Sequence, residues 1–172
     1  DRRQFNLHAL LAGASADLGL VPGLTVDDFQ GHEGDDWMEG QGNMNTLTGD
    51  NSELFFNSRV IGHDVMHSGE NDTDFDAESG DDIMVQGESV MRNEGMWGYD
   101  WAIYKDSTKS ADADLLRPIF TTDQQDILRN RFDKTEALSG WNKDDTLRGD
   151  AAWNHGLNMY GGMTDSAWMA GY

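Results

Sequence analysis

The chain of 172 residues is long enough for one domain and too short for a large multidomain enzyme. Its formal net charge of -20, from 32 acidic against 12 basic residues, disfavours nucleic acid and anionic membranes as partners and favours cations. Of the acids, 24 are Asp and 8 are Glu, and short Asp side chains suit tight loops that surround a hard cation with oxygen.

The sequence also limits how the chain can be stabilised and exported. It contains no cysteine, so it has neither a disulfide framework nor a thiolate metal site. An extracellular protein without disulfides needs another constraint, which bound calcium can supply. No apolar run reaches transmembrane length, and the opening DRRQFNLHALLAGASADLGL is a poor signal peptide. We therefore expect no membrane span and no N-terminal export signal.

Residues 1–30 are predicted to form an N-terminal capping segment. They contain a helix-like stretch, FNLHALLAG, which ends at Gly13 and is followed by a loop through VPGLTVDDF. Such a segment covers the open end of a stack of parallel strands, whose free edges otherwise invite aggregation.

A period of nine residues dominates region 31–95. Three columns recur at this spacing: Gly62, Asn71 and Gly80; Asp64, Thr73 and Asp82; and Met66, Phe75 and Met84. The stretches GHEGDDWME (31–39), GQGNMNTLT (40–48) and GWNKDDTLR (140–148) follow the same frame. The frame slips by one residue across 50–61, and we expect the rule to stop after Gly87.

These columns correspond to G-G-x-G-x-D-x-U-x, the calcium-binding nonapeptide of repeats-in-toxin proteins. Glycines allow positive φ and close backbone approach in a tight turn, which directs carbonyl oxygens inward. The Asp adds a carboxylate, and the apolar eighth residue anchors a very short strand in a thin core. The sequence therefore predicts a mainly β chain that forms a degenerate parallel β-roll over 31–95, with calcium ions between neighbouring coils.

The candidate calcium ligands lie in the loops of these repeats. They are Gly31, Glu33, Asp36, Asn45, Asp50, Gly62, Asp64, Asp72, Asp74, Gly80, Asp82 and Asp145. Thr73 replaces the key Asp of its repeat, although Asp72 and Asp74 flank it, so we expect fewer ions than repeats. The plainer alternative is that the acidic GDD clusters are ordinary polar turns of a β protein.

Residues 96–150 are predicted to pack on the roll as an aromatic strand, a helix and the final repeat. The run MWGYDWAIYK (96–105) resembles a strand whose aromatic residues form a core or, less commonly, a ligand-binding strip. The stretch TTDQQDILRNRFDKTEAL predicts one helix near 122–138, with Thr122 and Gln125 as a capping box. Arg129 and Arg131 are expected to pair with neighbouring acids.

The tail from residue 151 to residue 172 is rich in Gly, Met and aromatic residues. This apolar content favours docking onto the domain or onto a partner over free disorder.

The order of several stretches resembles the calcium-binding region of large bacterial secreted haem peroxidases of the animal type. These stretches are GHDVMHSG, DTDFDAESGDDIMVQG, RNEGMWGYDWAIYK and LRNRFDKTEALSGWNKDDTLRGD, and the resemblance covers approximately residues 30–150. It implies type I secretion, calcium-dependent folding outside the cell, and attachment to other domains that bind haem. The haem-binding histidines of such domains find no counterpart among the five histidines of this chain.

No catalytic site emerges from the sequence. His63 and His67 are four apart but fall in a turn and a strand, where that spacing has no metal-binding meaning. Nucleophile-elbow and phosphate-loop patterns are missing. Three functions stay open: a calcium-loaded secretion module, a binding or assembly module acting on a surface, a glycan or sister subunits, and a fragment of an enzyme whose activity needs another domain.

Overall fold

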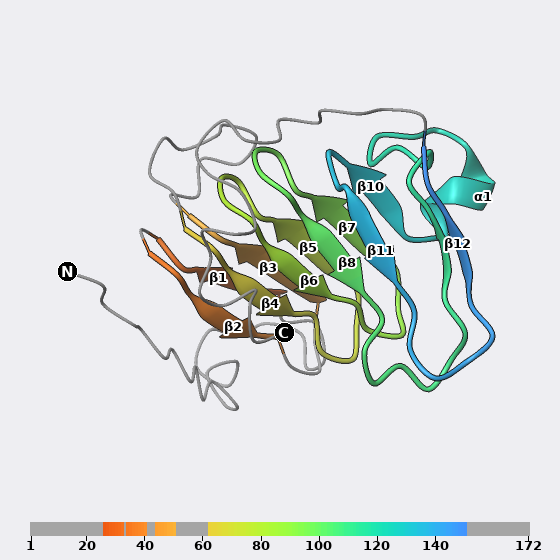
Figure 1. Cartoon of the computed structure of the whole chain (residues 1–172), viewed down its shortest axis with the longest axis horizontal. Coiled ribbons are helices and arrows are strands. Elements are labelled where there is room, and N and C mark those ends of the chain that lie inside the picture. Colours follow the sequence, from red (N-terminus) through yellow and green to blue (C-terminus); the bar gives the residue numbers. More distant parts are fainter. Residues whose placement is uncertain (1–25, 33, 41–43, 51–61, 151–172) are drawn as a thin grey trace, which may run out of the picture.

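The computed structural model describes residues 26–32, 34–40, 44–50 and 62–150, and the side chains among them from Phe29 onward. This part of the chain contains twelve β strands and one short α helix (Figure 1). Every pair of neighbouring strands within a sheet is parallel. The prediction of a mainly β chain with parallel strands is therefore confirmed.

The strands form two five-stranded sheets and one two-stranded sheet. Sheet I contains, in spatial order, β1 (Val26–Gln30), β3 (Met44–Thr48), β5 (Thr73–Asp76), β7 (Met91–Glu94) and β10 (Arg131–Asp133). Sheet II contains β2 (Trp37–Glu39), β4 (Val65–His67), β6 (Ile83–Val85), β8 (Trp101–Ile103) and β11 (Ala137–Ser139). The small sheet pairs β9 (Asp112–Asp114) with β12 (Thr146–Arg148).

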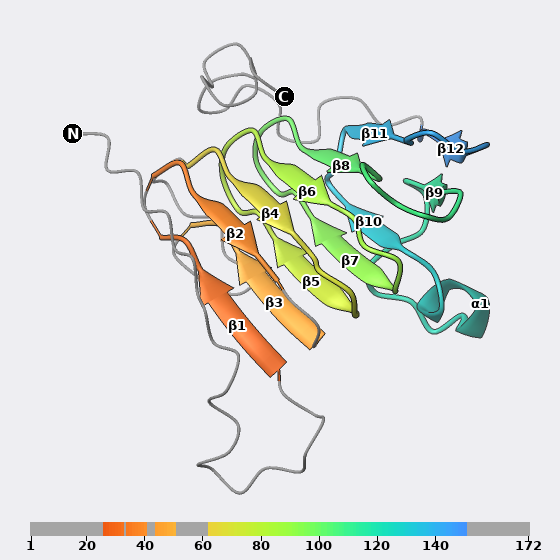
Figure 2. The same ribbon diagram turned by 90° about the horizontal axis from the view of Figure 1, so that it is seen from below.

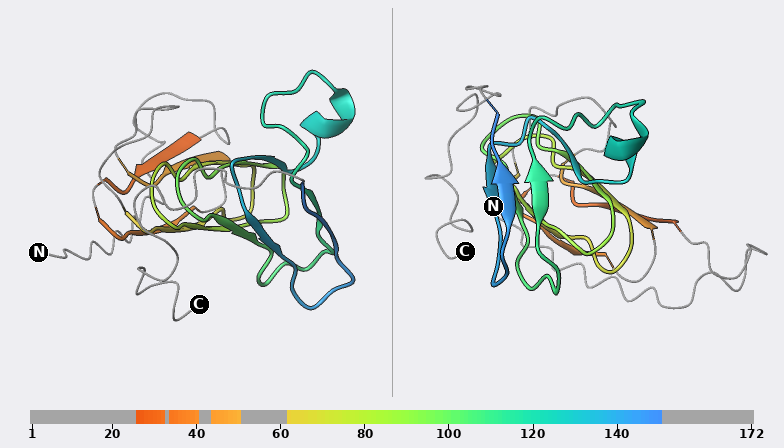
Figure 3. Two further views of the ribbon diagram at one scale, coloured as in Figure 1. Left: turned by 45° about the horizontal axis from the view of Figure 1, so that its top comes forward. Right: turned by 90° about the vertical axis from the view of Figure 1, so that its right-hand side faces the viewer.

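The chain alternates between sheets I and II from β1 to β8, so each pair of strands forms one coil, and successive coils lie side by side (Figures 2 and 3). Strand register repeats every 18 residues, because Val65 pairs with Ile83 and Ile83 pairs with Trp101. Each coil therefore corresponds to two nonapeptides. Between Trp37 and Val65 the offset is 28 residues, so the frame slip seen in the sequence is an insertion of ten residues between β3 and β4.

A single layer of apolar side chains fills the space between the two sheets. Met38, Met66 and Met84 extend inward from sheet II and meet Leu47 and Phe75 from sheet I. All five are buried, with exposures from 0% to 3%. Because strands of three to five residues alternate their faces, each strand offers only one or two side chains to this core. The apolar eighth position of the repeat is thus the main source of hydrophobic stabilisation, at about 1.5–3 kcal/mol for each side chain.

A second apolar layer lies on the opposite face of sheet II. Val65, Ile83, Val85 and Ile103 are buried there, with Trp37 and Trp101 packed against them. Trp101 thus belongs to this outer cluster, whereas Tyr104 packs in another cluster with Ala102 and Phe132. The aromatic run 96–105 is therefore divided between a loop and two clusters, and only Trp101–Ile103 is a strand.

The helix expected near 122–138 is much shorter than predicted. Only α1, Gln124–Ile127, is helical, and its N-cap is Asp123, which accepts a hydrogen bond from the backbone N–H of Gln125 (2.9 Å). The capping box expected from Thr122 is therefore wrong by one residue. The rest of the segment forms β10 and β11, because Phe132 is buried against the adjacent strands of the parallel stack.

The expected N-terminal cap lies almost entirely outside the described residues, as does the docking tail at 151–172. The α helix of the described part is four residues long, which is far too short to cross a membrane.

Truncating the inner layer should destabilise the fold strongly. Phe75 is 1% exposed, so Phe75→Ala should lower the free energy of unfolding by about 3–5 kcal/mol, measured by denaturant unfolding under conditions in which the chain is folded. Phe120 is 70% exposed, and the control Phe120→Ala should change the free energy of unfolding by less than about 0.5 kcal/mol. Equal losses for the two variants would contradict the assignment of the core.

Candidate metal centre

The loops that lead from sheet I to sheet II lie along one edge of the structure, called here the acidic edge. The described residues of these loops are 31–32, 34–36, 49–50, 62–64, 77–82, 95–100 and 134–136. The loops that lead from sheet II to sheet I lie along the other edge, called here the opposite edge (Figure 2). Because each coil uses one nonapeptide at each edge, alternate repeats of the sequence belong to different edges.

Five carboxyl groups are stacked along the acidic edge, and together they form the acidic ladder. Asp36 is the first member, and each later member accepts a hydrogen bond from the backbone N–H of the one before it. These bonds run to Asp64 from Asp36 (2.8 Å), to Asp82 from Asp64 (2.7 Å), to Asp100 from Asp82 (3.1 Å) and to Glu136 from Asp100 (2.8 Å). One carboxylate oxygen from each coil is thus fixed to the backbone of the adjacent coil. The ladder therefore depends on the parallel register of sheet II.

The remaining carboxylate oxygens of the ladder are buried without a hydrogen bond. Oδ2 of Asp36, Asp64, Asp82 and Asp100 are all in this state. Asp64, Asp82 and Asp100 are 0% exposed as whole residues. No Lys or Arg of the described residues forms an ion pair with these four aspartates. A buried carboxylate without a partner is costly, so this oxygen either binds a proton or faces a cation.

Burial and mutual repulsion raise the pKa values of the ladder. Burial is the largest cause for Asp64, Asp82 and Asp100, and it raises the pKa of each well above the ordinary value. The next cause is a neighbouring carboxylate: Asp50 for Asp64, Asp100 for Asp82, and Glu136 for Asp100. Without a cation, the folded chain therefore favours the protonated form of these groups.

Backbone oxygen also converges on the acidic edge. A Cβ placed on Gly31 would lie 2.5 Å from the carbonyl oxygen of Gly49 and 2.8 Å from Oδ2 of Asp36. At Gly80, where φ is +145°, a Cβ would collide with the carbonyl oxygen of Gly62. Only glycine allows such close approach of adjacent coils. The space between coils is consequently bordered by carboxylate and carbonyl oxygens, which are the ligands that hard cations prefer.

Most of the predicted ligands do come together on this edge. Asp36, Asp64 and Asp82 are ladder members, and Gly31, Asp50, Gly62 and Gly80 lie in the same loops. Asp50 is fully buried, and neither of its carboxylate oxygens makes a hydrogen bond of normal geometry, although the amides of Gly62 and Ser79 lie close enough to lower its pKa.

Four predicted ligands lie elsewhere, and Glu33 lies outside the described residues. Asn45 and Asp72 are at the opposite edge, where Asp72 is exposed and accepts a hydrogen bond from the backbone N–H of Val90 (3.0 Å). Asp74 is on β5 and forms an ion pair with Arg92 (3.3 Å). Asp145 precedes β12 of the small sheet, and both of its oxygens accept backbone hydrogen bonds. The strand register therefore separates these residues from the acidic ladder.

The opposite edge carries neutral side chains where the acidic edge carries carboxylates. Asn45, Thr73 and Met91 occupy the corresponding position and are paired with one another in register. The side-chain N–H₂ of Asn45 (3.0 Å) and the hydroxyl of Thr73 (3.1 Å) both donate to the carbonyl oxygen of Ser68. These carbonyl lone pairs are thus satisfied by hydrogen-bond donors of the chain itself.

Two ladder members, Asp100 and Glu136, were not predicted from the sequence. Asp100 was missed because the repeat frame was expected to stop after Gly87. Strands β6 and β8 keep the 18-residue register, which places Asp100 beside Asp82 and Gly98 beside Gly80. The spacing from Asp64 to Asp82 to Asp100 would have identified Asp100 directly. Glu136 follows 36 residues later, in a repeat that lacks the glycine pattern, and only the pairing of β8 with β11 reveals it.

Arg129 and Arg131, which lie outside the acidic edge, were both expected to pair with acidic residues. Arg129 pairs with Asp112 (3.6 Å), as expected for a base among acids. Arg131 instead donates to the carbonyl oxygen of Ile119 (3.1 Å). Asp112 also pairs with Arg117 and Arg148 and is therefore a structural centre of the small sheet.

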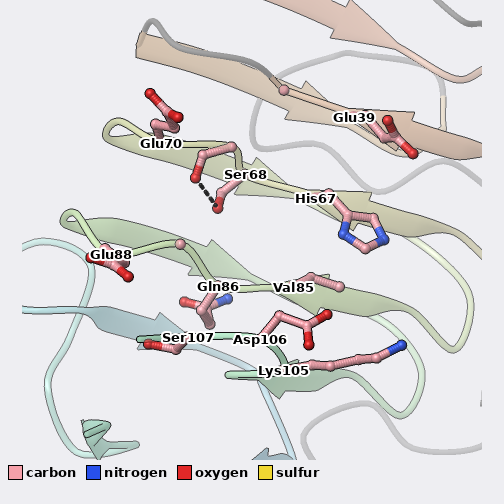
Figure 4. Close-up of a pocket in the computed structure, with 13 residues that line it drawn as sticks. Glu39, His67, Ser68, Glu70, Val85, Gln86, Glu88, Lys105, Asp106 and Ser107 are labelled. Atoms are coloured by element: carbon pink, nitrogen blue, oxygen red, sulfur yellow. Dashed lines mark hydrogen bonds between the residues drawn. The ribbon is translucent and has the colours of Figure 1, made fainter. Parts of the chain in front are cut away.

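Ser68 and His67, at the opposite edge, do not form a nucleophile–base pair. A hollow of about 660 Å³ opens at the opposite edge, beside His67 and Ser68 (Figure 4). The hydroxyl of Ser68 donates to the carbonyl oxygen of Gly69 (3.3 Å), so no base activates it. The ring of His67 stacks on Trp37 (4.8 Å between centroids), and burial lowers its pKa. His63 accepts a hydrogen bond from the backbone N–H of Asp81 (2.8 Å), so the two histidines do not form a pair.

Side chains alone do not complete a metal site among the described residues, where no group of three His, Asp or Glu residues converges on one point. Any cation at the acidic edge would therefore need backbone carbonyl oxygens in addition to the carboxylates. The chain matches no protein-family model, no curated protein and no solved structure.

Lowering the pH should stabilise the metal-free chain. Burial, the largest cause in each case, raises the pKa of Asp36 to about 7, of Asp50 to about 8 and of Glu136 to about 7. A carboxyl group with a raised folded-state pKa contributes stability below its ordinary pKa and loses that contribution as the pH rises through the folded value. The β signal of the chain in EDTA, measured by circular dichroism, should therefore rise as the pH is lowered from about 8 to about 5. A β signal that falls over this range would contradict the uncompensated burial of these groups.

Proposed function

We propose that the chain is a calcium-binding β-roll module of the repeats-in-toxin type, and that it folds when it meets calcium outside the cell. The acidic ladder carries this proposal, because four buried aspartates each leave one oxygen without a partner and without a nearby base. Two parallel sheets with an 18-residue register support the roll architecture. The ligands would be ladder carboxylates and carbonyl oxygens of the adjoining loops, such as that of Gly49.

Calcium suits this edge better than other common biological cations. The unpaired side-chain atoms of the ladder aspartates are oxygens, whereas zinc and copper prefer nitrogen and sulfur. His63 lies in the same loops, but its Nδ1 accepts a hydrogen bond from the backbone N–H of Asp81. Carbonyl and carboxylate oxygens from flexible loops suit the six to eight ligands and variable geometry of calcium, whereas magnesium demands a strict octahedron and keeps its waters. Weak sites of the extracellular kind would stay empty in the cytosol and fill at the millimolar calcium concentrations found outside the cell.

Binding would be confined to the acidic edge. Asn45 and Thr73 direct hydrogen-bond donors into the loops of the opposite edge, and a donor repels a cation. This asymmetry gives fewer ions than nonapeptides, in keeping with the degenerate repeats. Asp72 and Asp74 do not compensate for Thr73, because Asp72 accepts from a backbone amide and Asp74 pairs with Arg92.

The wider setting is proposed from the sequence resemblance alone. The module would belong to a bacterial protein exported by type I secretion and would be attached to a haem peroxidase domain. Within the described residues, none of the side chains forms a catalytic site, so the role of this region in such a protein would be folding and stability. A Soret band in the purified chain, which would indicate bound haem, would contradict the assignment of haem binding to another domain.

Calcium should drive folding, and the ladder should determine the midpoint of the transition. At neutral pH and low salt, the chain in EDTA should lack the β signal in circular dichroism and gain it on calcium titration. Asp82 is 0% exposed in the ladder, so Asp82→Asn should raise the calcium midpoint by about tenfold.

The matched control is Asp144→Asn, because Asp144 is exposed and lies outside the acidic edge. This variant should leave the midpoint within about twofold of the parent chain, as expected for a surface charge. Sodium chloride at matched ionic strength should not replace calcium. A chain that is fully folded and metal-free after exhaustive EDTA treatment would refute the proposed function.

A further inference from the structure

The second residue of each acidic-edge loop distinguishes the loops from one another. The first residues of four loops are equivalent, because each donates its backbone N–H to a backbone carbonyl oxygen at the end of the adjacent strand of sheet I, at 2.8–3.0 Å. The donors and acceptors are Gly31 and Thr48, Gly49 and Asp76, Ala77 and Glu94, and Gly95 and Asp133. The residues that follow are His32, Asp50, Glu78 and Met96. Among these four loops, negative charge at this position is thus restricted to the two middle ones, which carry Asp50 and Glu78.

Shared backbone geometry supports this equivalence. His32, Glu78 and Met96 all have positive φ, at 66°, 67° and 73°. Residues other than glycine rarely adopt this conformation, so its recurrence in three loops marks one structural position. Exchanging residues between these positions therefore leaves the backbone requirement unchanged. Asp50 is not among the residues with positive φ, and its place in the series rests on the strand register.

Asp50 extends into the space between coils and lies close to the ladder. A Cβ placed on Gly62 would lie 2.8 Å from Oδ1 of Asp50 and 3.2 Å from Oδ1 of Asp64, and would also meet the carbonyl oxygen of Gly34. A Cβ placed on Gly49 would meet Oδ2 of Asp64 and the carbonyl oxygen of Ala77. Two carboxylates and two carbonyl groups thus border the same part of the edge.

The burial of Asp50 is an independent sign that a ligand belongs there. Asp50 is 0% exposed, and neither of its oxygens makes a hydrogen bond of normal geometry. Glu78 is also buried, at 1% exposure, and is close enough to Asp50 to raise its pKa. In the loop of Asp100, by contrast, Met96 takes this position, and the neighbouring carboxylate outside the ladder is that of Asp81, one oxygen of which accepts a hydrogen bond from the backbone N–H of Tyr99 (3.0 Å).

We propose that Asp50 and Asp64, with the carbonyl oxygens of Gly34 and Ala77, border the tightest calcium site of the acidic edge, which is filled first and fixes the two middle coils before the others. This inference rests on the proposed function and adds an order of binding to it. Calcium affinity rises with the number of charged ligands at a site. Asp50 offers two carboxylate oxygens that make no hydrogen bond of normal geometry, and Glu78 adds negative charge beside it, so the first ion would bind there.

Calorimetric titration of the full chain with calcium tests this order of binding. The parent chain should show a tight first step followed by weaker ones. Asp50→Asn should weaken the first step by about tenfold or more, whereas Asp100→Asn should leave it unchanged and weaken a later one. Met96→Glu, which copies Glu78 at the equivalent position, should add a second tight step.

Melting in EDTA at about pH 5, where protonated carboxyl groups favour the folded metal-free chain, separates loss of binding from misfolding. Because Asn is uncharged, like the protonated side chain of Asp50, Asp50→Asn should melt no lower than the parent chain at that pH, and at neutral pH it should gain less β signal on calcium addition. If calcium binds but Asp50→Asn and Asp100→Asn weaken the same step equally, the order is refuted while the proposed function stands. If the parent chain binds no calcium, the proposed function fails and this inference fails with it.

Discussion

The stacking of carboxyl groups along one edge is the constraint on which the rest of the structure depends. Each ladder member after Asp36 satisfies a backbone N–H of the preceding coil, so an acceptor is required at each of these steps. An Asn side chain also offers an oxygen acceptor and would carry no charge. The hydrogen bonds alone therefore do not explain why Asp36, Asp64, Asp82 and Asp100 are all acidic. The second, unpaired oxygen needs its own explanation, which the proposed cation between coils would provide.

The opposite edge is a natural comparison within the same molecule. It has the same register and the same parallel strands, yet Asn45, Thr73 and Met91 stand in place of the ladder. Its loops satisfy their carbonyl oxygens with side-chain donors, as Thr73 does with Ser68. A parallel coil can thus turn at an edge without buried charge. The carboxylates of the acidic edge are therefore a feature of its chemistry and are not a requirement of the turn.

The parallel strands and most of one edge could be predicted from the sequence, because both depend on a local period. Glycine, Asp and an apolar residue at fixed spacing determine a loop and a short strand wherever they recur, so Asp36, Asp64 and Asp82 were found together. What the period could not reveal is which nonapeptides share an edge, since this depends on two repeats forming one coil. Asp72 and Asp145 were grouped with the ladder for this reason.

The segment 122–138 shows the other limit of sequence reasoning. Its local pattern favours a helix, but Phe132 is buried against neighbouring strands, and the pairing of β10 and β11 with β7 and β8 determines the outcome. Tertiary contacts commonly override helix propensity in this way. Glu136 was overlooked because its role comes from the same pairing, and no glycine pattern accompanies it.

The small core makes the charge of the acidic edge decisive for folding. Domains are stable by only about 5–15 kcal/mol, and each unit of pKa shift corresponds to about 1.4 kcal/mol. Several buried carboxyl groups with raised pKa values can therefore offset the contribution of one layer of methionine, leucine and phenylalanine side chains. Dissolved salt screens exposed charges but acts weakly on buried ones. Under the proposed function, a cation inside the edge would relieve this repulsion at neutral pH, so that binding and folding would become one event.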